Sequence, residues 1–337
     1  MLKRVLSSTY GIVATTVAGF GGLFADAFLG KVGFIVTLVL ALFFLILAFF
    51  KERRIQHLYA NETIPIPIVI SVDDNTPIEI HFKALLARIS EDDRRFEGLE
   101  KKLENYFNIS EQMLTFKYDG DMYDQARLIS FLQIIRYVLN DIQRRLDNKA
   151  CFHLFFLRRP AVGVALGGMF RTDGIVVYQN NDYSNTLDKV AKIDSRKYKE
   201  KVSEFKHFKI IKKLKEKRDK HLLVAIQISS HTVSLEHPAL KKFKNIIVMD
   251  SVLNGTIPPD AESFENDVWV EHAQEIYNII NQYKGEFDAI TLVHSMPEAV
   301  GVILGMALEN YWDIDVCQFD RGEYRVVVNL KQIKYYF

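Results

Sequence analysis

The sequence of 337 residues has few cysteines and almost no excess of charge of one sign. Its two cysteines, Cys151 and Cys317, are too few for a disulfide framework, and a structural zinc site normally needs about four ligands. Its 43 Lys and Arg residues against 42 Asp and Glu residues give a net charge of +1, which excludes the broad basic surface of a protein that coats long nucleic acid. We therefore expect no metal centre and no long nucleic-acid partner.

Enzyme signatures are also lacking. The chain has no G-x-x-x-x-G-K-[ST], G-x-S-x-G or H-E-x-x-H motif, and no G-x-G-x-x-G motif that follows a strand. His231 and His294 are candidate general bases, and Ser230 and Ser295 are candidate nucleophiles, but no third catalytic partner is recognisable. The sequence therefore predicts a binding protein with no catalytic residues and no cofactor.

The apolar residues are concentrated near the amino end. Residues 32–50 read VGFIVTLVLALFFLILAFF without a charge, and as a helix they would extend roughly 28 Å, close to the thickness of a bilayer core. Lys51, Arg53 and Arg54 follow directly, and such a basic cluster marks the cytoplasmic side of a span. We expect a transmembrane helix here, with the bulk of the chain in the cytoplasm.

A preceding stretch, residues 7–25, is uncharged and rich in glycine, alanine and threonine, which suits a helix that packs against a partner. We predict a two-helix, multi-pass transmembrane region over residues 7–50, with both termini cytoplasmic. Two alternatives are a signal peptide and a first segment that lies in the membrane interface. A signal sequence is disfavoured because the run ends in Phe49-Phe50-Lys51 and not at a small-residue cleavage site.

After a basic linker over residues 51–63, short apolar runs alternate with amphipathic stretches. Near-continuous apolar strands separated by helices predict an α/β fold with a parallel sheet covered on both faces. The expected helices are residues 124–146 and 268–283, each directly before an apolar strand. The expected strands are residues 68–72, 152–156, 175–178, 222–228, 246–249, 289–293 and 314–317.

An internal repeat is the most informative feature. AVGVALG at residues 161–167 matches AVGVILG at residues 299–305 with one difference, and each copy follows a strand and a short loop. The soluble part, residues 64–337, is therefore predicted to be two α/β half-domains in tandem, residues 64–192 and 221–337.

The connector between the halves, residues 193–220, is rich in lysine. One interpretation is a basic rim that faces anionic lipid or a phosphate ligand. The other, which we favour, is a solvated amphipathic helix around Phe205, Phe208, Ile211 and Leu214.

Each repeat predicts a helix that begins just after the carboxyl end of a strand, where open α/β sheets bind ligands. The glycines at 163, 167, 301 and 305 share one helix face, and we expect them to permit close packing of helix on sheet. The free N–H groups at a helix start favour a bound phosphate. Ser229 and Ser230 could contact such a phosphate or, alternatively, only cap a helix. The candidate ligand-binding residues occupy the loops after the strands: Arg158, Arg159, Ser229, Ser230, His231, His294, Ser295 and Met296.

The tandem pattern of an apolar strand, a polar loop, a PAVGVALG helix and a strand ending in VVYQ resembles the SAVED domain, a fused pair of CARF-like Rossmann units. The second copy, LVHSMPEAVGVILGMAL followed by IDVCQFDRGEYRVVVNL, carries most of the resemblance. A SAVED domain behind two transmembrane helices resembles the membrane effectors of CBASS anti-phage systems.

The resemblance implies a receptor for a cyclic di- or trinucleotide made by a CD-NTase, a cGAS-like nucleotidyltransferase. It further implies self-association on ligand binding, disruption of the lipid bilayer and abortive infection. Within the family, Arg158, Arg159, Ser229, Ser230, His231, His294 and Ser295 match the strand-end loops, whereas Asp73 and Asp74 depart from a phosphate-binding pattern. The alternatives are a ring nuclease, a nucleotide-sensing membrane protein of a type III CRISPR system, and a membrane scaffold.

Overall fold

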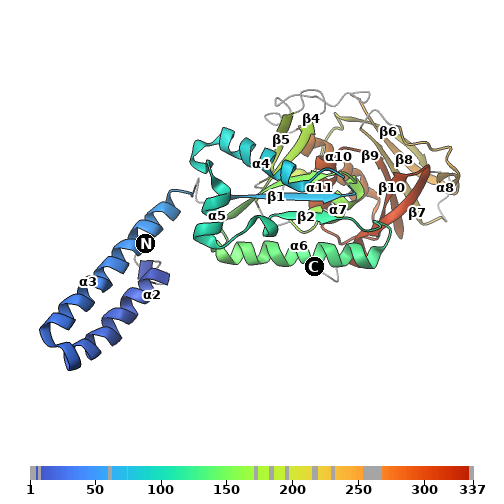
Figure 1. The fold of residues 1–337 in the computed structure, drawn as a ribbon. Coiled ribbons are helices and arrows are strands. Elements are labelled where there is room, and N and C mark those ends of the chain that lie inside the picture. The colour runs from blue at the N-terminus through green and yellow to red at the C-terminus, as the bar shows by residue number, and fades with distance from the viewer. Residues whose placement is uncertain are drawn as a thin grey trace. The chain divides into compact units, whose positions relative to one another are not determined.

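The computed structural model describes residues 5–6, 9–59, 63–73, 75–170, 174–181, 186–193, 197–214, 219–228, 232–252 and 268–333. The chain divides into two compact units (Figure 1). One comprises Met1–Ile64 and Asp93–Asn108, and the other comprises Pro65–Asp92 and Ile109–Phe337. Each unit is described separately below.

The first unit holds the apolar segment. Helix α2 (Thr9–Thr16) continues through a π-helical turn, η1 (Val17–Gly21), into the long helix α3 (Gly22–Gln56). The ammonium of Lys51 near the end of α3 lies 5.7 Å from the ring centroid of Tyr10, so α2 packs back along α3. The unit also contains the short helix η2 (Arg94–Phe96) and helix α5 (Leu99–Phe107).

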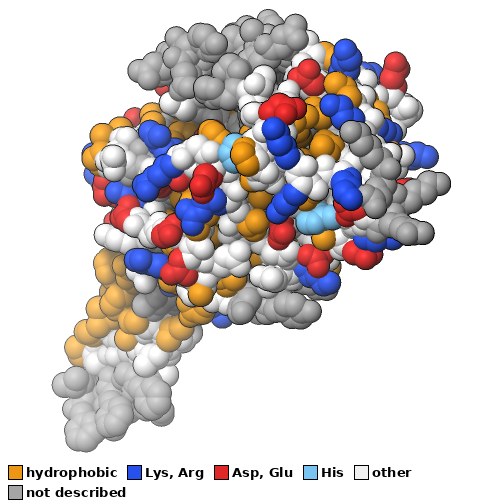
Figure 2. Space-filling view, turned by 90° about the vertical axis from the view of Figure 1, so that its right-hand side faces the viewer, with side chains coloured by type: hydrophobic (Ala, Val, Ile, Leu, Met, Phe, Trp, Pro, Cys, Tyr) orange, Lys and Arg blue, Asp and Glu red, His pale blue; other side chains and the backbone are white. Residues whose placement is uncertain are grey.

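One helix in the described part of the chain is long and apolar enough to cross a membrane, Val32–Gln56, with a mean hydropathy of 3.0 over its most apolar window. Its large side chains are exposed, including Val32 at 72% and Ile35 at 58%, so it is not the core helix of a soluble domain (Figure 2). The prediction of two spans is not supported, because the apolar helix Tyr10–Gly19 has a length of only about 15 Å.

The second unit begins with a five-stranded sheet in the order β2-β1-β3-β4-β5. Strands β1 and β2 pair in parallel, as do β3 and β4, whereas β5 is antiparallel to β4. The strands are β1 (Ile64–Val72), β2 (Thr115–Tyr118), β3 (Ala150–Leu157), β4 (Ile175–Asn181) and β5 (Thr186–Ile193). Strands β1 and β2 lie between helix α4 (Ile78–Asp92) and helix α6 (Gln125–Arg145) (Figure 1). The structure also has a short helix η3 (Glu111–Met113) before β2.

The second half repeats this arrangement in a six-stranded sheet, in the order β11-β10-β9-β7-β8-β6. Strands β8, β7, β9 and β10 are mutually parallel, and β11 and β6 are antiparallel at the two edges. The strands are β6 (Phe208–Leu214), β7 (His221–Gln227), β8 (Asn245–Ser251), β9 (Ala289–Ser295), β10 (Ile314–Asp320) and β11 (Glu323–Asn329). The helices of this half are α8 (Pro238–Lys241), α10 (Val268–Tyr283), α11 (Glu298–Leu308) and α12 (Leu330–Ile333).

Five strands of the second sheet match the first sheet, because β8-β7-β9-β10-β11 repeats the order β2-β1-β3-β4-β5. The first two strands of each set pair in parallel, as do the third and fourth, and the last strand is antiparallel. The helix of each repeat follows the third of these strands: α7 (Pro160–Gly167) follows β3, and α11 follows β9. The predicted tandem of α/β halves is thereby confirmed. All seven predicted strands and both predicted helices are present.

The connector between the halves contains a strand and not the amphipathic helix that we expected around Phe208 and Ile211. Strand β6 pairs along its whole length with β8, from Phe208 opposite Ser251 to Leu214 opposite Asn245. Pairing with a sheet edge satisfies the backbone of the strand, and β-branched isoleucines suit it. Before β6, the connector is pinned to α10, where the buried carboxylate of Glu275 accepts hydrogen bonds from the backbone N–H groups of Lys206 and His207.

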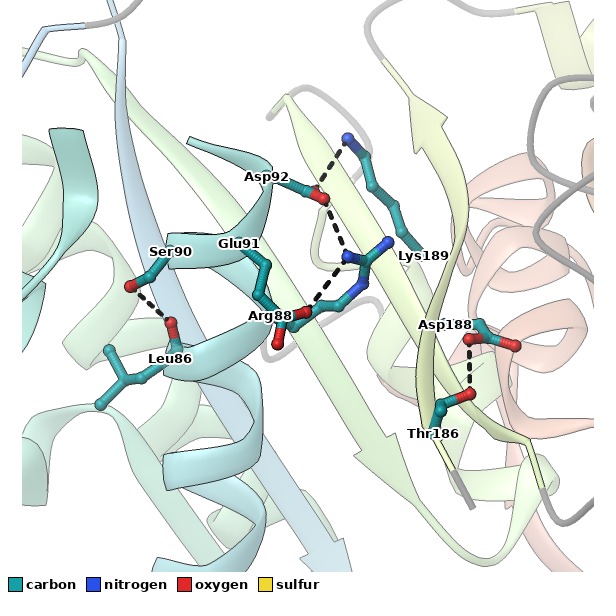
Figure 3. A network of polar contacts seen from close by, with 8 residues as sticks. All are labelled: Leu86, Arg88, Ser90, Glu91, Asp92, Thr186, Asp188 and Lys189. Atoms are coloured by element: carbon teal, nitrogen blue, oxygen red, sulfur yellow. Dashed lines mark hydrogen bonds and ion pairs between the residues drawn. The ribbon is translucent and has the colours of Figure 1, made fainter. Parts of the chain in front are cut away.

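Helix α4 is tied to β5 by a small ionic network (Figure 3). The Asp92 carboxylate lies 3.2 Å from Nη1 of Arg88 and 3.4 Å from Nζ of Lys189. Glu91 lies 3.4 Å from the same Arg88 atom. The two cations offset the carboxylates at the carboxyl end of α4, where the helix dipole disfavours negative charge.

Candidate functional site

Helices α7 and α11 pack closely along their length because glycines remove the side chains between them. A methyl group added at Gly167 would overlap the Val302 carbonyl oxygen, and one added at Gly305 would overlap that of Val164. At Gly301 it would lie 2.7 Å from the carbonyl oxygen of Pro160. These three glycines therefore pack helix against helix across the two halves. The sequence predicted that all four glycines permit packing of a helix on the sheet. Of the four, only Gly163 does so, since a methyl group there would lie 2.9 Å from the ring of Phe156 on β3.

Each helix start is capped by a glutamine from the opposite half. The backbone N–H of Ala299 in α11 donates to Oε1 of Gln179 on β4 at 3.0 Å. The N–H of Ala161 in α7 is related in the same way to Gln318 on β10, at 3.5 Å. Gln179 also donates through Nε2 to the Glu298 carboxylate at 2.9 Å. The halves thus exchange equivalent contacts about a local pseudo-twofold axis.

Arg159, in the left-handed conformation just before α7, bridges the ends of two strands. Its guanidinium pairs with Asp73 at the end of β1 and with Asp320 of β10 at 3.2 Å. Partial burial opposes its charge, but the hydrogen bond with Asp73 and the charge of Asp320 outweigh that effect and raise the pKa of Arg159. The arginine is therefore a fixed cation that two carboxylates already neutralise.

Two further side chains extend this cluster. The Arg325 guanidinium on β11 lies 3.7 Å from the ring centroid of Tyr123, a cation–π distance. Burial, followed by the charge of Asp320, raises the pKa of Tyr123 to about 12, so its hydroxyl remains a neutral donor. We call the five side chains around the two helix starts, Arg159, Gln179, Glu298, Gln318 and Asp320, the helix-end junction.

The other candidate ligand residues differ in accessibility. Arg158 is exposed and, like Arg159, has a positive φ. His294 and Met296 are buried, at 5% and 4% exposure, and burial lowers the pKa of His294 to about 4, so its ring is neutral. The Ser295 hydroxyl is buried without a hydrogen-bond partner, as is Nε2 of His294.

Ser229, Ser230 and His231 lie outside the described residues. The structure nevertheless describes Ile228 directly before them, whose N–H donates to the Ser295 carbonyl at 2.9 Å. The chain therefore enters that loop beside the end of β9. Among the described residues, no group of three or more His, Cys, Asp and Glu side chains is arranged to hold a metal ion.

Sequence reasoning located the helix starts and Arg159 but missed most of the helix-end junction. Gln179 and Gln318 close the VVYQ and DVCQ runs of the two repeats, and this shared position was the available signal. Asp320 and Glu298 gave no local signal, because their partners Arg159 and Gln179 are more than 100 residues away in sequence.

Comparison with known proteins identifies the fold. No family model and no curated protein matches the chain. Among solved structures, it is similar to the Acinetobacter baumannii Cap4 SAVED/CARF-domain containing receptor with the cyclic trinucleotide 2'3'3'-cAAA, with a TM-score of 0.50 and 14% identity. That match covers 86% of this chain and 56% of the receptor, so the chain spans little more than half of that protein's length.

Two more structures of Cap4 receptors are similar at slightly lower scores. The A. baumannii receptor with 3'3'3'-cAAA has a TM-score of 0.49 and 13% identity, over 96% of this chain and 78% of that one. The Moraxella osloensis receptor has a TM-score of 0.48 and 14% identity, over 97% and 74%. The expected fold, a tandem pair of CARF-like halves as in a SAVED domain, is confirmed.

Proposed function

We propose that this protein is a membrane-anchored CBASS effector that binds a cyclic di- or trinucleotide through its SAVED-type fold. The observation that carries the proposal is the helix-end junction, where one helix start and one equivalent strand from each half converge. The similar A. baumannii receptor was solved with a cyclic trinucleotide. A ring-shaped ligand that spans both halves suits a site built from both.

The proposed anchor is α3, with the α/β part on the cytoplasmic side. Most of its large apolar side chains from Val32 to Phe50 are exposed, and Lys51, Arg53 and Arg54 follow the apolar run. The contact between Tyr10 and Lys51 brings the start of α2 to the basic end of α3. We therefore propose that the basic end of α3 and the α/β part that follows it lie on the cytoplasmic side of the bacterial inner membrane.

The proposed action is ligand-gated. A CD-NTase would supply the cyclic nucleotide after infection, and ligand binding would favour self-association of the receptor. A ligand can shift this equilibrium only if it binds the assembled form more tightly than the single chain. Assembly would crowd the membrane helices and disrupt the bilayer, which leads to abortive infection.

The test is calorimetry on the full chain in lipid nanodiscs with a panel of cyclic di- and trinucleotides. We expect one member to bind with micromolar or tighter affinity, and linear adenylates of equal length to bind far more weakly because they lack the closed ring. The ligand should be recovered intact by chromatography, since we propose no catalysis. Absence of heat with every cyclic nucleotide would contradict the receptor function, and cleavage would favour a ring nuclease.

Membrane disruption has its own measurement. Liposomes filled with a self-quenching dye and carrying the full chain should leak when the cognate cyclic nucleotide is added, and should stay sealed with a non-binding member of the panel. The substitution Leu40→Arg, in the middle of the apolar run, should abolish leakage because a charge at the bilayer centre costs about 3 kcal/mol or more. Leakage that is independent of the ligand would contradict gating.

A further inference from the structure

The helix-end junction has few groups left for a phosphate, although helix starts are usual anion sites. The N–H of Ala161 and that of Ala299 already face glutamine oxygens. The first residue of α7 is Pro160, which has no N–H to offer. A phosphate at these helix starts would have to displace contacts that hold the two halves together.

The charges of the junction also disfavour a phosphate. Arg159 is shared by Asp73 and Asp320, and Glu298 adds a third carboxylate. A carboxylate accepts hydrogen bonds and donates none, and a phosphodiester oxygen likewise only accepts. The chemistry of the junction therefore matches a ligand group that donates.

Glu298 is the best placed of these acceptors. It opens α11 where the two halves meet, since a methyl group added at Gly163 of α7 would lie 3.4 Å from the Glu298 carbonyl oxygen. Gln179 from the opposite half holds one carboxylate oxygen at 2.9 Å. The side chain is half-buried, so the carboxylate is fixed in position and still accessible.

We propose that Glu298 is a specificity-determining residue that accepts a hydrogen bond from the amino group of a nucleobase, so that the helix-end junction reads bases and the phosphates bind elsewhere. This inference rests on the function proposed above. In a cyclic oligonucleotide the base amino groups are N–H donors, whereas the phosphates are acceptors.

The experiment measures binding of a cyclic triadenylate to the full chain in nanodiscs, with Glu298→Gln and the control Glu323→Gln. Glu323 is exposed at the start of β11 and gives the same charge change outside the junction. If Glu298 acted by charge alone, its neutralisation would tighten binding of a trianion. We expect the opposite, a loss of about 10- to 100-fold, since a hydrogen bond to a charged group is lost. Glu323→Gln should bind within about twofold of the wild type.

A second binding experiment uses wild-type protein and modified ligands, so its result does not depend on how the variant folds. Wild-type protein should bind a cyclic trinucleotide of purine, which lacks the amino group of adenine, about 10- to 100-fold more weakly than the triadenylate. The 2'-deoxy triadenylate should bind like the parent. Three results would each overturn the inference. They are equal affinity for the cyclic purine trinucleotide and the triadenylate, tighter binding of the triadenylate by Glu298→Gln, and a loss of affinity confined to the 2'-deoxy ligand. If wild-type protein binds no cyclic nucleotide at all, the proposed function itself fails.

Discussion

Replacement of Gly305 by alanine should destabilise the α/β unit by at least about 3 kcal/mol. The added methyl group would overlap the Val164 carbonyl, and a backbone atom cannot move aside as a flexible side chain can. Helices α7 and α11 would have to separate, which exposes surface that is now fully buried on both. Because the free energy of unfolding of a protein is only about 5–15 kcal/mol, this substitution would remove a large part of it.

Urea denaturation of the full chain, followed by fluorescence, measures the loss. The matched control is Gly285→Ala, because a methyl group there would meet nothing within 4 Å and the glycine has an ordinary φ. We expect the control to be neutral or slightly stabilising, by about 0.4–1 kcal/mol. A Gly305→Ala protein as stable as the control would show that the two helices do not pack through this glycine.

The second large effect is a loss of stability in mild acid, caused by the buried His272 and His294 and the half-buried His153. Burial lowers the pKa of His153 to about 3, with the nearby Lys189 and Lys192 contributing, and lowers those of His272 and His294 to about 4. These rings are neutral in the folded protein at pH 5, whereas the unfolded chain protonates them below about pH 6.5. The unfolded state therefore binds more protons, and stability falls as the pH drops from about 6.5 towards 4.

At pH 5 each histidine should contribute about 2 kcal/mol of destabilisation relative to pH 7, or about 6 kcal/mol in total. The urea midpoint at both pH values measures the difference. His294→Gln should remove about a third of it, because that ring is buried with Nε2 unpartnered. His57→Gln, at an exposed position, should leave it unchanged. A midpoint that is equal at pH 7 and pH 5 would contradict the assignment of neutral buried rings.

The four described strands that the sequence failed to predict share one property: all lie at sheet edges. Strands β2, β5, β6 and β11 occupy the four edges of the two sheets. An edge strand is apolar on fewer sides than a central one, so its sequence carries lysines and arginines that hide its pattern. In β6 the spacing of Phe208, Ile211 and Leu214 also fits one helix face, and only pairing with β8 makes it a strand.

The candidate site was predictable only in part, because local sequence places a residue in the fold but does not show its distant partners. Arg159 lies directly after a strand and before a helix, so local sequence placed it correctly between the carboxyl end of β3 and the start of α7. Its ion pairs with Asp73 and Asp320 were not predictable, since they join three segments distant in sequence. The same holds for Gln179 and Gln318, whose partners lie in the opposite half.

Composition and periodicity alone determined the long apolar helix near the amino end, the central strands, the crossover helices and the duplication. These features depend on the burial of apolar residues at fixed spacing, which is a local property of the chain. Only the tertiary structure decided that the repeated glycines pack helix against helix and that the lysine-rich connector adds a strand to the second sheet. It also decided that Arg159, after β3, forms ion pairs with two carboxylates. Those outcomes depend on contacts between groups far apart in sequence, and no local pattern encodes such contacts.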